Sequence, residues 1–390
     1  MAIKRIGILT GGGDVPGLNA VIKSVVYGSS RFGCEVVGIR RGWKGLLAPD
    51  WVKGRDDSYF LDLNRENTRA IDRTGGTFLH TSRRKPTKTK DEEVPDHLKH
   101  RLGEFKEVEP GVVDLTPVVL ENLEKLGVDN LVPIGGDDTL SYADHLNKLG
   151  FPMVCVPKTM DTDVRTTEYC IGFSTALTRA VDAIGRQRTT IGSHERVGIF
   201  RIFGRDAGFT ALFTAYITSE RCCIPEYKFD LEKLIGLLVE DKKNNPSNYS
   251  IVILSEGASW DGHEVREYGE EDAYGHRKKM SVGEDLSDEV KAQTGYSTVV
   301  SDLTYDLRGG APDFLDKMVA TTFATMAVEC IGDGGRGKMA AGQKGCYTLA
   351  DLPDASGGPR SVNVEKMYNT DRYRPSYPNK VGMPILLTEL

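Results

Sequence analysis

Short apolar runs alternate with stretches of helical periodicity along most of the chain. The runs predict strands because they are short and rich in β-branched residues. They comprise Arg5–Thr10, Glu35–Ile39, Asn130–Ile134, Met153–Val156, Val197–Ile202 and Ser250–Leu254. The segment after the first strand places apolar residues at helical spacing, namely Leu18, Val21, Ile22, Val25 and Val26. Residues 175–188 form a second predicted helix, whose inward side chains are expected to be Leu177, Val181 and Ile184. This alternation predicts an α/β fold with mainly parallel strands, the last two of them in a second sheet.

Four segments lack this alternation. Residues 83–110 are crowded with charge and contain three prolines, which predicts a surface excursion with one or two helices. Residues 261–295 are acidic and poor in apolar side chains, and a peripheral hairpin or helix is expected there. Residues 332–344 are rich in glycine and lysine without an apolar period, so a loop is predicted. The proline-containing tail from Asn369 is expected to wrap irregularly over the surface.

Composition narrows the class of protein. The 390 residues are enough for two domains or one large one, and the net charge of −6 gives no electrostatic basis for binding nucleic acid or a membrane. Seven scattered cysteines without a CxxC spacing predict free thiols in a reducing compartment. The N-terminus runs directly into a strand, and no apolar run reaches 18 residues. We therefore expect a soluble, cytoplasmic protein.

Two of the predicted strands end in turns that collect phosphate-binding and acidic groups. Val132–Thr139 reads Val-Pro-Ile-Gly-Gly-Asp-Asp-Thr, and Val156–Asp163 reads Val-Pro-Lys-Thr-Met-Asp-Thr-Asp. The glycines of the first turn leave backbone N–H groups open to an anionic oxygen, and its aspartates suit Mg²⁺. The second turn adds a lysine and two aspartates, a candidate base and its neighbour. Phosphoryl transfer needs charge neutralisation, a metal and a proton acceptor, so the two turns predict that reaction.

A third turn, Gly11–Gly13, lies between the first strand and the first helix. Free N–H groups at a helix N-terminus favour anions, whereas the alternative is a tight turn that only needs positive φ. The second glycine turn, at Gly135, favours phosphate binding. The chain has no Walker A pattern, and the glycine run fails the GxGxxG spacing. Neither a P-loop enzyme nor a dinucleotide-binding fold is indicated.

Together with Thr10–Asn19, these turns resemble the 6-phosphofructokinase family from about Ile6 to about Ile331. Further matching motifs follow in order at family-like spacing: Gly75–Arg83, Ile171–Ala176, Ser193–Arg196, Phe203–Arg205, Ser255–Gly257 and Arg308–Gly310. The resemblance implies two similar three-layer α/β domains with the active site in the cleft between them. Residues 1–170 with 308–365 would bind the phosphoryl donor, residues 171–307 would bind the sugar phosphate, and residues 366–390 would be an irregular C-terminal tail.

The resemblance also implies roles at the transfer centre. Asp161 matches the catalytic base, which takes the proton of the sugar C1 hydroxyl, and Asp137 matches a magnesium-linked aspartate. Asp138 stands where ATP users typically have glycine. Two like charges about 4 Å apart repel by about 4 kcal/mol at an effective dielectric of 20, so Asp138 should repel a nucleotide's further phosphate. Lys158 could neutralise pyrophosphate in the vacated space, although some ATP users also carry this lysine. The alternative for Asp138 is a cap on a helix beginning near Thr139.

The remaining ligands are implied residue by residue. The donor would be bound by Gly12, Arg83, Gly136 and Lys158. The sugar phosphate would be bound by Thr159, Asp161, Asp163, Arg196, Phe203, Gly204, Arg205, Glu256, Tyr305 and Arg308. Arginine's planar fork suits a terminal phosphate, and a glutamate accepts hydrogen bonds from sugar hydroxyls. In the family Arg196 reaches the neighbouring subunit's site, which implies a homodimer or homotetramer.

Two departures from the family pattern affect these expectations. Thr162 replaces the asparagine that usually separates the two aspartates of the second turn, so fine positioning of the base is in question. Val299 replaces a second cross-subunit arginine, and Lys317 or a tail residue could compensate. The identity of the phosphosugar is correspondingly open.

The combined prediction is a phosphotransferase that uses Mg²⁺-pyrophosphate to phosphorylate the 1-hydroxyl of fructose 6-phosphate. Three alternatives stay open: ATP as donor, another ketose phosphate such as sedoheptulose 7-phosphate as acceptor, and a non-catalytic regulatory subunit. The last is disfavoured because a pure binder needs no base. A nicotinamide-dependent dehydrogenase is disfavoured by the glycine spacing.

Overall fold

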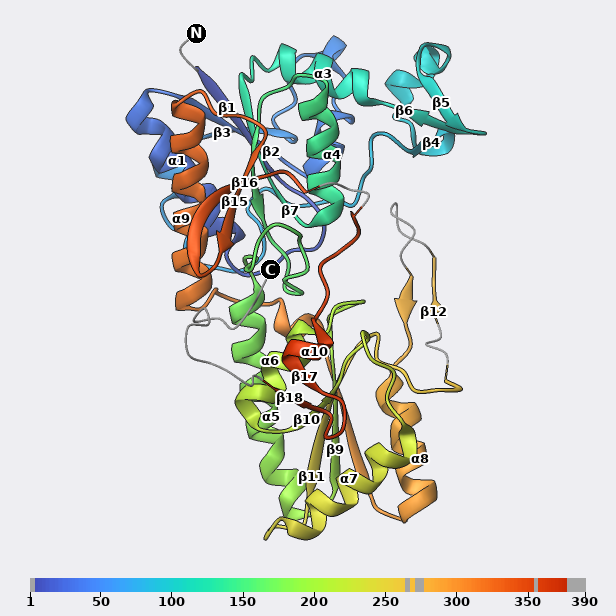
Figure 1. The fold of residues 1–390 in the computed structure, drawn as a ribbon. Helices are drawn as coiled ribbons and strands as arrows, with labels where there is room; N and C mark the ends of the chain where they lie inside the picture. Colours follow the sequence, from blue (N-terminus) through green and yellow to red (C-terminus); the bar gives the residue numbers. More distant parts are fainter. Residues whose placement is uncertain (1–3, 264–266, 271–276, 354–356, 377–390) are drawn as a thin grey trace.

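Two β-sheets, one in each half of an elongated molecule, organise the chain (Figure 1). The structure, a computed structural model, describes residues 4–263, 267–270, 277–353 and 357–376. Strands and helices alternate through both halves, and most strand pairs are parallel. The predicted α/β fold is confirmed.

The first sheet has seven strands in the order β16-β15-β8-β7-β1-β2-β3. Their bounds are β1 Arg5–Thr10, β2 Glu35–Ile39, β3 Phe60–Leu63, β7 Asn130–Gly135, β8 Val154–Pro157, β15 Lys338–Gln343 and β16 Cys346–Asp351. The two edge strands, β3 and β16, are antiparallel to their neighbours, and the inner strands are parallel. All four strands predicted in this half are present, and β1 and β2 begin and end where the apolar pattern placed them.

The prediction of a loop over residues 332–344 is wrong. The second half of that segment forms β15, in which Met339, Ala340 and Ala341 are fully buried. This strand pairs with β8 on one side and β16 on the other. Small alanines give neither strong hydrophobicity nor a strand propensity signal, so neighbouring strands and not local sequence determine this element.

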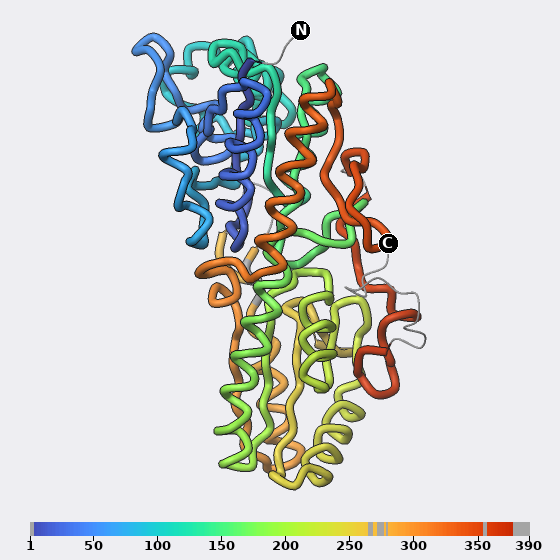
Figure 2. Tube along the Cα trace, turned by 90° about the vertical axis from the view of Figure 1, so that its left-hand side faces the viewer, coloured from blue at the N-terminus to red at the C-terminus, as the bar shows by residue number. Residues whose placement is uncertain are grey.

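Helices cover both faces of the first sheet. Helices α1 (Leu18–Ser29) and α9 (Phe314–Gly332) lie side by side on one face (Figure 2), and α3 (Thr116–Lys125) and α4 (Asp137–Lys148) cover the other. Alternate strand residues therefore enter different cores, with Ile8 packed on the α1 side and Leu9 in the other cluster. The five apolar residues predicted to bury one face of α1 are all buried.

The second sheet has four parallel strands in the order β10-β11-β9-β14. The strands are β9 Val197–Ile202, β10 Arg221–Cys223, β11 Ser250–Ser255 and β14 Thr298–Leu303, which confirms both strands predicted here. Its helices are α5 Phe173–Ser193, α6 Phe209–Thr218, α7 Leu231–Asn244 and α8 Val282–Thr294. Helices α5 and α6 lie on one face and α7 and α8 on the other (Figure 1).

The predicted inner face of α5 is partly wrong. Ile184 is buried, but Leu177 and Val181 are only half-buried. The fully buried side chains of α5 include Phe173, Ala176 and Ala180. Alanines on this face allow close packing, and the hydrophobic pattern gave them too little weight.

Three peripheral regions were predicted in outline. The charged excursion contains the helical turns η5 Asp91–Glu93 and η6 Asp96–Glu104, and it adds a small antiparallel sheet of β4 Thr89–Lys90, β6 Val112–Asp114 and β5 Lys106–Glu109. Residues 261–295 contain both expected elements, a hairpin of β12 Glu267–Tyr268 and β13 Lys278–Lys279 and the helix α8. That helix is not peripheral, because Leu286 and Val290 are buried against the second sheet.

The C-terminal segment is more ordered than predicted. It forms α10 Val364–Met367, β17 Tyr368–Asn369 and β18 Arg374–Pro375, and Tyr373 is only 1% exposed. The rest of the predicted tail, residues 377–390, lies outside the described residues. The remaining short elements are α2 Arg65–Thr68, η1 Ser30–Phe32, η2 Gly42–Leu46, η3 Trp51–Lys53, η4 Ile71–Arg73 and η7 Tyr305–Leu307.

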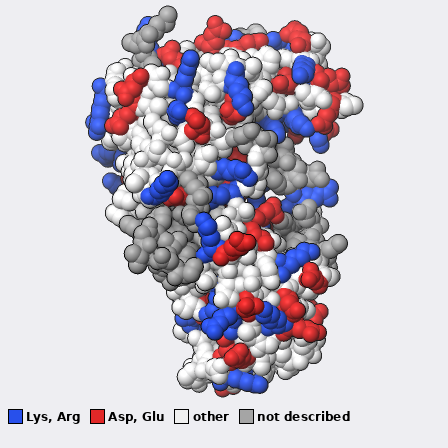
Figure 3. Space-filling view, viewed as in Figure 1, with Lys and Arg blue, Asp and Glu red and all other residues white. Residues whose placement is uncertain are grey.

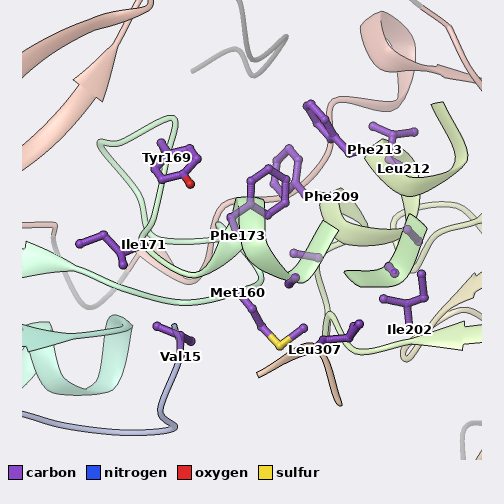
Figure 4. Close-up of a cluster of buried hydrophobic side chains, with 14 of the residues drawn as sticks. Val15, Met160, Tyr169, Ile171, Phe173, Ile202, Phe209, Leu212, Phe213 and Leu307 are labelled. Atoms are coloured by element: carbon purple, nitrogen blue, oxygen red, sulfur yellow. The ribbon is translucent and has the colours of Figure 1, made fainter. Parts of the chain in front are cut away.

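One hydrophobic core runs continuously between the two halves. Where they meet, Val15, Met160 and Ile171 pack in the same cluster as Phe209 and Leu307 (Figure 4). The division at residues 170/171 and 307/308 stays a prediction. Lys, Arg, Asp and Glu side chains are interspersed over both halves of the face in Figure 3. Within the described ranges, no helix is both long enough and apolar enough to cross a membrane.

Candidate active site

A cavity of about 380 Å³ lies where strands of both sheets end, at their C-terminal ends. Open α/β sheets bind their ligands at this edge. The structure brings together most of the predicted site residues here: Gly12, Arg83, Gly136, Asp137, Asp138, Lys158, Thr159, Asp161, Asp163, Arg205 and Arg308. Arg196, Phe203, Gly204, Glu256 and Tyr305 are not among the lining residues.

Two N–H groups of the glycine turn after β1 already donate within the protein, and donor binding by Gly12 stays a prediction. The N–H of Gly11 donates to the carbonyl of Ile134 (2.9 Å), and the N–H of Gly12 donates to that of Ser82 (3.1 Å). Glycine is needed for a different reason. Gly12 has φ +78°, and a Cβ there would lie 3.2 Å from Lys158 Nζ. A Cβ at the next glycine would overlap the Arg308 guanidinium, so the turn allows two cations to approach the backbone.

The second glycine turn leads into the N-terminus of α4. This helix begins at Asp137 with Gly136 as its N-cap, and no side chain caps it. The alternative role of Asp138 as a helix cap is therefore wrong, since this residue lies inside the first turn. The helix N-terminus faces the cavity with uncapped N–H groups, which favours an anion.

Three carboxylates at the cavity have raised pKa values. Burial and the neighbouring charge of Asp138 raise the pKa of Asp137 to about 7, against the opposing effect of Arg205. Burial raises the pKa of Asp161, and burial with the charge of Asp161 raises that of Asp163 well above its ordinary range. Such perturbed groups in a cavity mark a functional site, and a bound cation would favour their charged forms.

The turn that carries Asp161 leaves one of its carboxylate oxygens unpaired. Oδ1 of Asp161 is buried and has no hydrogen-bond partner among the described residues. The next residue, Thr162, has φ +49°, which is strained for a β-branched side chain, and its hydroxyl accepts from the N–H of Cys170 (3.1 Å). Threonine thus supports the turn where the family has asparagine. A buried acceptor without a donor is suited to receive a proton from a substrate hydroxyl.

Arg205, Arg308 and Lys158 lie close enough for their charges to act on the Asp161 carboxylate. Lys158 is only 4% exposed, and burial followed by the charges of Arg308 and Arg205 lowers its pKa to about 8. Arg83 also lines the cavity, and so does Lys85, which the sequence did not identify. Nε of Arg308 is buried without a partner within the described part of the chain. Several cations that line one cavity indicate that its ligand is anionic.

On the side of the second sheet, Glu256 accepts hydrogen bonds from the protein, and its binding of sugar hydroxyls stays a prediction. Its Oε1 accepts from Arg201 (3.1 Å), and its Oε2 accepts from the N–H of Arg205 (3.2 Å). Both oxygens therefore hold protein groups, and Glu256 supports the strained turn at Arg205, where φ is +44°. Arg201 was not predicted, although an arginine inside an otherwise apolar strand was the available signal. Gly204 is needed because a Cβ there would lie 2.8 Å from the carbonyl of Ala207.

Phe203 and Tyr305 form an aromatic support beside the cavity. Their rings meet edge to face with centroids 5.5 Å apart. The guanidinium carbons of Arg201 and Arg308 lie 5.9 and 5.8 Å from the centroid of Phe203. Phe203 therefore positions two arginines, whereas Tyr305 is 65% exposed.

Arg196 lies far from this cavity. It precedes Val197 at the opposite end of β9, so the strand separates it from the Arg205 turn by roughly 20 Å. Binding of substrate by Arg196 in a neighbouring subunit's site stays a prediction. Val299 is opposite Gly198 in β14, half-buried, and brings no cation to the cavity.

Comparisons with known proteins were made with this geometry in hand. The family model described as Phosphofructokinase matches residues 5–331. Pyrophosphate–fructose 6-phosphate 1-phosphotransferase of Streptomyces coelicolor is 38% identical over 86% of this chain and 90% of its own length. ATP-dependent 6-phosphofructokinase 3 of the same organism is 36% identical over 90% of this chain and 94% of its own.

A solved structure has the same fold at low sequence identity. The pyrophosphate-dependent phosphofructokinase from Marinobacter aquaeolei superposes with a TM-score of 0.70 at 19% identity, covering 98% of this chain and 95% of that one. Relatives named for either phosphoryl donor are thus about equally similar in sequence.

Proposed function

Because the chain belongs to the phosphofructokinase family, we propose that it transfers a phosphoryl group from Mg²⁺-pyrophosphate to the 1-hydroxyl of fructose 6-phosphate. Overall similarity does not separate the two donors, so the choice depends on residues in the cavity. The observation that supports pyrophosphate best is that Asp138 and the buried Lys158 line the same polar cavity.

The lining of the cavity favours a small polyanion over a nucleotide. Among the described residues that line it, no side chain is aromatic, and Pro353 and Pro359 are the only apolar ones. Nucleobase sites are mainly apolar, with few polar groups. Asp138 adds a negative charge where a nucleotide's further phosphate would continue. The ammonium of Lys158 has the opposite effect, because it attracts a compact anion of high charge.

The proposed transfer needs a base, cations at the phosphoryl group and cations at the sugar phosphate, all held in fixed positions. Asp161 would accept the proton of the sugar hydroxyl through its unpaired Oδ1 as the hydroxyl attacks phosphorus. Lys158 and Arg83 would neutralise the phosphoryl oxygens, and Arg205 and Arg308 would bind the sugar phosphate. An oriented cation shielded from water is worth more than one in bulk solvent, so burial of Lys158 strengthens its contact.

The carboxylates fit a magnesium ion held partly by substrate. In the described part of the chain, no three His, Cys, Asp or Glu side chains are grouped to hold a metal. Mg²⁺ commonly uses one or two carboxylates together with phosphate oxygens and water. Asp137 would hold it, with Asp163 close enough for their charges to interact. The ion, when bound, would neutralise charge on the transferred phosphate.

Steady-state kinetics with each donor tests the proposal. The wild type should have a higher kcat/KM for pyrophosphate than for ATP. Replacing both Asp138 and Lys158 by glycine should weaken pyrophosphate use and allow measurable ATP use. Asp138→Gly alone should harm pyrophosphate use less than Lys158→Gly alone, because only the lysine contacts the anion favourably. Preference of the wild type for ATP would refute the donor assignment.

Val299 favours a second candidate acceptor. An apolar side chain where the family has a phosphate ligand weakens the case for one particular phosphosugar. We therefore propose that sedoheptulose 7-phosphate be assayed beside fructose 6-phosphate, and a higher kcat/KM for it would replace the acceptor. The proposal also includes a homodimer or homotetramer, in which Arg196 would serve a neighbouring site.

A further inference from the structure

The chain beyond the family match returns to the cavity and then continues to the second sheet. The family model ends at residue 331, whereas Gly358 and Pro359 line the cavity. From there the segment descends along the second half of the molecule (red in Figures 1 and 2). Residues 360–362, named here the clasp, occupy the crossing between the two halves. No sequence motif pointed to them.

One end of the clasp holds the turn that carries the proposed base. The N–H of Arg360 donates to the carbonyl of Asp163 (2.6 Å), and its Nη1 donates to the carbonyl of Thr167 (2.7 Å). The Nε of Arg165 donates to the carbonyl of Gly358 (2.8 Å). Three hydrogen bonds thus join this part of the segment to residues 163–167.

The other end holds the turn that carries the phosphate-binding arginine. The N–H of Val362 donates to Oε1 of Glu226 (2.8 Å), and the same oxygen accepts from the N–H of Gly208 (2.9 Å). Gly208 lies three residues after Arg205 and precedes α6. A Cβ at Gly208 would lie 2.7 Å from Oε2 of Glu226, so the carboxylate is packed directly against this turn. The guanidinium of Arg360 covers the ring of Phe209, the first residue of α6, at 4.3 Å.

We propose that the clasp and Glu226 are positioning residues that fix the separation between the Asp161–Asp163 turn and the Arg205–Gly208 turn. The inference rests on the proposed function, because it assigns the base to the first turn and a sugar-phosphate ligand to the second. The N–H of Arg360 binds the first turn directly, and the N–H of Val362 is joined to the second through Oε1 of Glu226. A short piece of backbone and one carboxylate therefore set the spacing of the two turns. A misplacement of about 1 Å at a reacting centre can cost about a hundredfold in rate.

The far end of the segment is anchored independently. The N–H of Cys222 donates to the carbonyl of Tyr373 (2.8 Å), and the hydroxyl of Tyr368 donates to the carbonyl of Cys222 (2.6 Å). These bonds should keep the segment in place when a clasp contact is removed. Loss of the contact should then move the two turns relative to one another without releasing the segment.

The test compares Glu226→Ala with Glu226→Gln in the full chain. Alanine removes the acceptor that joins Val362 to Gly208, whereas glutamine keeps a carbonyl oxygen there. We expect kcat to fall about ten- to a hundredfold in the alanine variant and less than about threefold in the glutamine variant. KM for the phosphoryl donor should stay within about twofold, because the donor side of the cavity is untouched. Glu365→Ala, an exposed glutamate of the same segment, is the matched control and should retain wild-type kcat.

A double-mutant cycle adds a measurement that a purely structural role would not move. Arg360→Ala removes the contacts to Thr167 and Phe209, and Arg372→Ala is its exposed control. Glu226 and Arg360 both fix the distance between the same two turns. The fold-decrease in kcat of the double variant should therefore be smaller than the product of the two single fold-decreases. Glu226→Ala protein that melts earlier but keeps kcat within twofold would overturn the proposal, as would multiplicative effects in the cycle.

The outcome is separable from that of the proposed function. If the wild type uses ATP and not pyrophosphate, the donor assignment fails, and the same variants are measured with ATP. If the wild type transfers no phosphate, binding of fructose 6-phosphate by calorimetry replaces kcat. Glu226→Ala should then weaken that binding at least tenfold relative to Glu226→Gln, and equal affinities would refute the clasp.

Discussion

Pyrophosphate binding should be accompanied by proton uptake at Lys158. The ammonium of this lysine is buried next to Arg308 and Arg205, which lowers its pKa from 10.5 to about 8. At pH 8 about half of the unliganded molecules therefore hold it neutral. A bound polyanion adds opposite charge next to the ammonium and should return the pKa towards its ordinary value. The expected uptake at Lys158 is about half a proton per site at pH 8 and about a tenth at pH 7.

Calorimetry in two buffers of different ionisation enthalpy measures this number. Pyrophosphate exchanges protons of its own on binding, so the quantity of interest is the difference between the wild type and Lys158→Met. Methionine replaces the unbranched side chain up to its last carbon and removes the charged nitrogen. Lys90→Met, at an exposed position, is the matched control and should give the wild-type value. A difference below about 0.2 proton at pH 8 would refute the assignment of Lys158 as a direct pyrophosphate ligand.

The same pKa predicts a stability effect of opposite sign to the effect on activity. Between pH 8 and 10.5 the unfolded chain binds a proton at this lysine that the folded chain does not, so folded stability rises with pH there. Below pH 8 the full cost of burying the charge is present, about 3 kcal/mol. Lys158→Met should therefore be more stable than the wild type at pH 7 by up to about 3 kcal/mol, with the difference vanishing by pH 10.5. Urea unfolding of the unliganded proteins at several pH values measures it.

Three further predictions address other parts of the structure. Asp161→Asn should lower kcat about a hundred- to ten-thousandfold with little change in sugar-phosphate affinity by calorimetry, and more than a tenth of wild-type turnover would remove Asp161 from the role of base. Hybrid oligomers of Asp161→Asn and Arg196→Ala chains should recover activity through sites that contain neither lesion, and verified hybrids without recovery would contradict the action of Arg196 in trans. Asp316→Asn should destabilise the fold by about 2–3 kcal/mol in urea unfolding, because this buried carboxylate accepts hydrogen bonds from Tyr169, Gly172 and Thr175.

The strands that the sequence predicted correctly share one property. Their residues are buried on both faces, so β1, β7, β9 and β11 are nearly continuous apolar runs. Among the strands that were not predicted, β15 contains the small residues of a segment packed between two neighbours. Its position depends on pairing with β8, about 180 residues earlier in the chain, and no local pattern carries that information.

The candidate site could be predicted to the extent that its residues follow parallel strands. Turns after β1, β7 and β8 must meet at one edge, so Gly12, Asp137 and Lys158 were expected to lie together and do. What the sequence could not supply is which partner each polar group takes. Glu256 accepts hydrogen bonds from Arg201 and the Arg205 turn because β9 and β11 end side by side there. The N–H groups of Gly11 and Gly12 donate to the carbonyl of Ile134 in β7 and to that of Ser82.

The unliganded site holds features that oppose folding. Burial shifts the pKa values of Lys158 and of three carboxylates in the unfavourable direction, and Thr162 and Arg205 have positive φ. Buried atoms of Asp161 and Arg308 have no hydrogen-bond partner among the described residues. Each feature has a natural complement in a magnesium-bound polyanion and a sugar phosphate. A ligand that binds only the folded state at a hundred times its Kd stabilises it by about 2.7 kcal/mol. The continuous core beneath the cavity and the clasp across it must hold these groups together until the ligands arrive. Substitutions in the clasp should therefore lower stability less when pyrophosphate and Mg²⁺ are present than when they are absent.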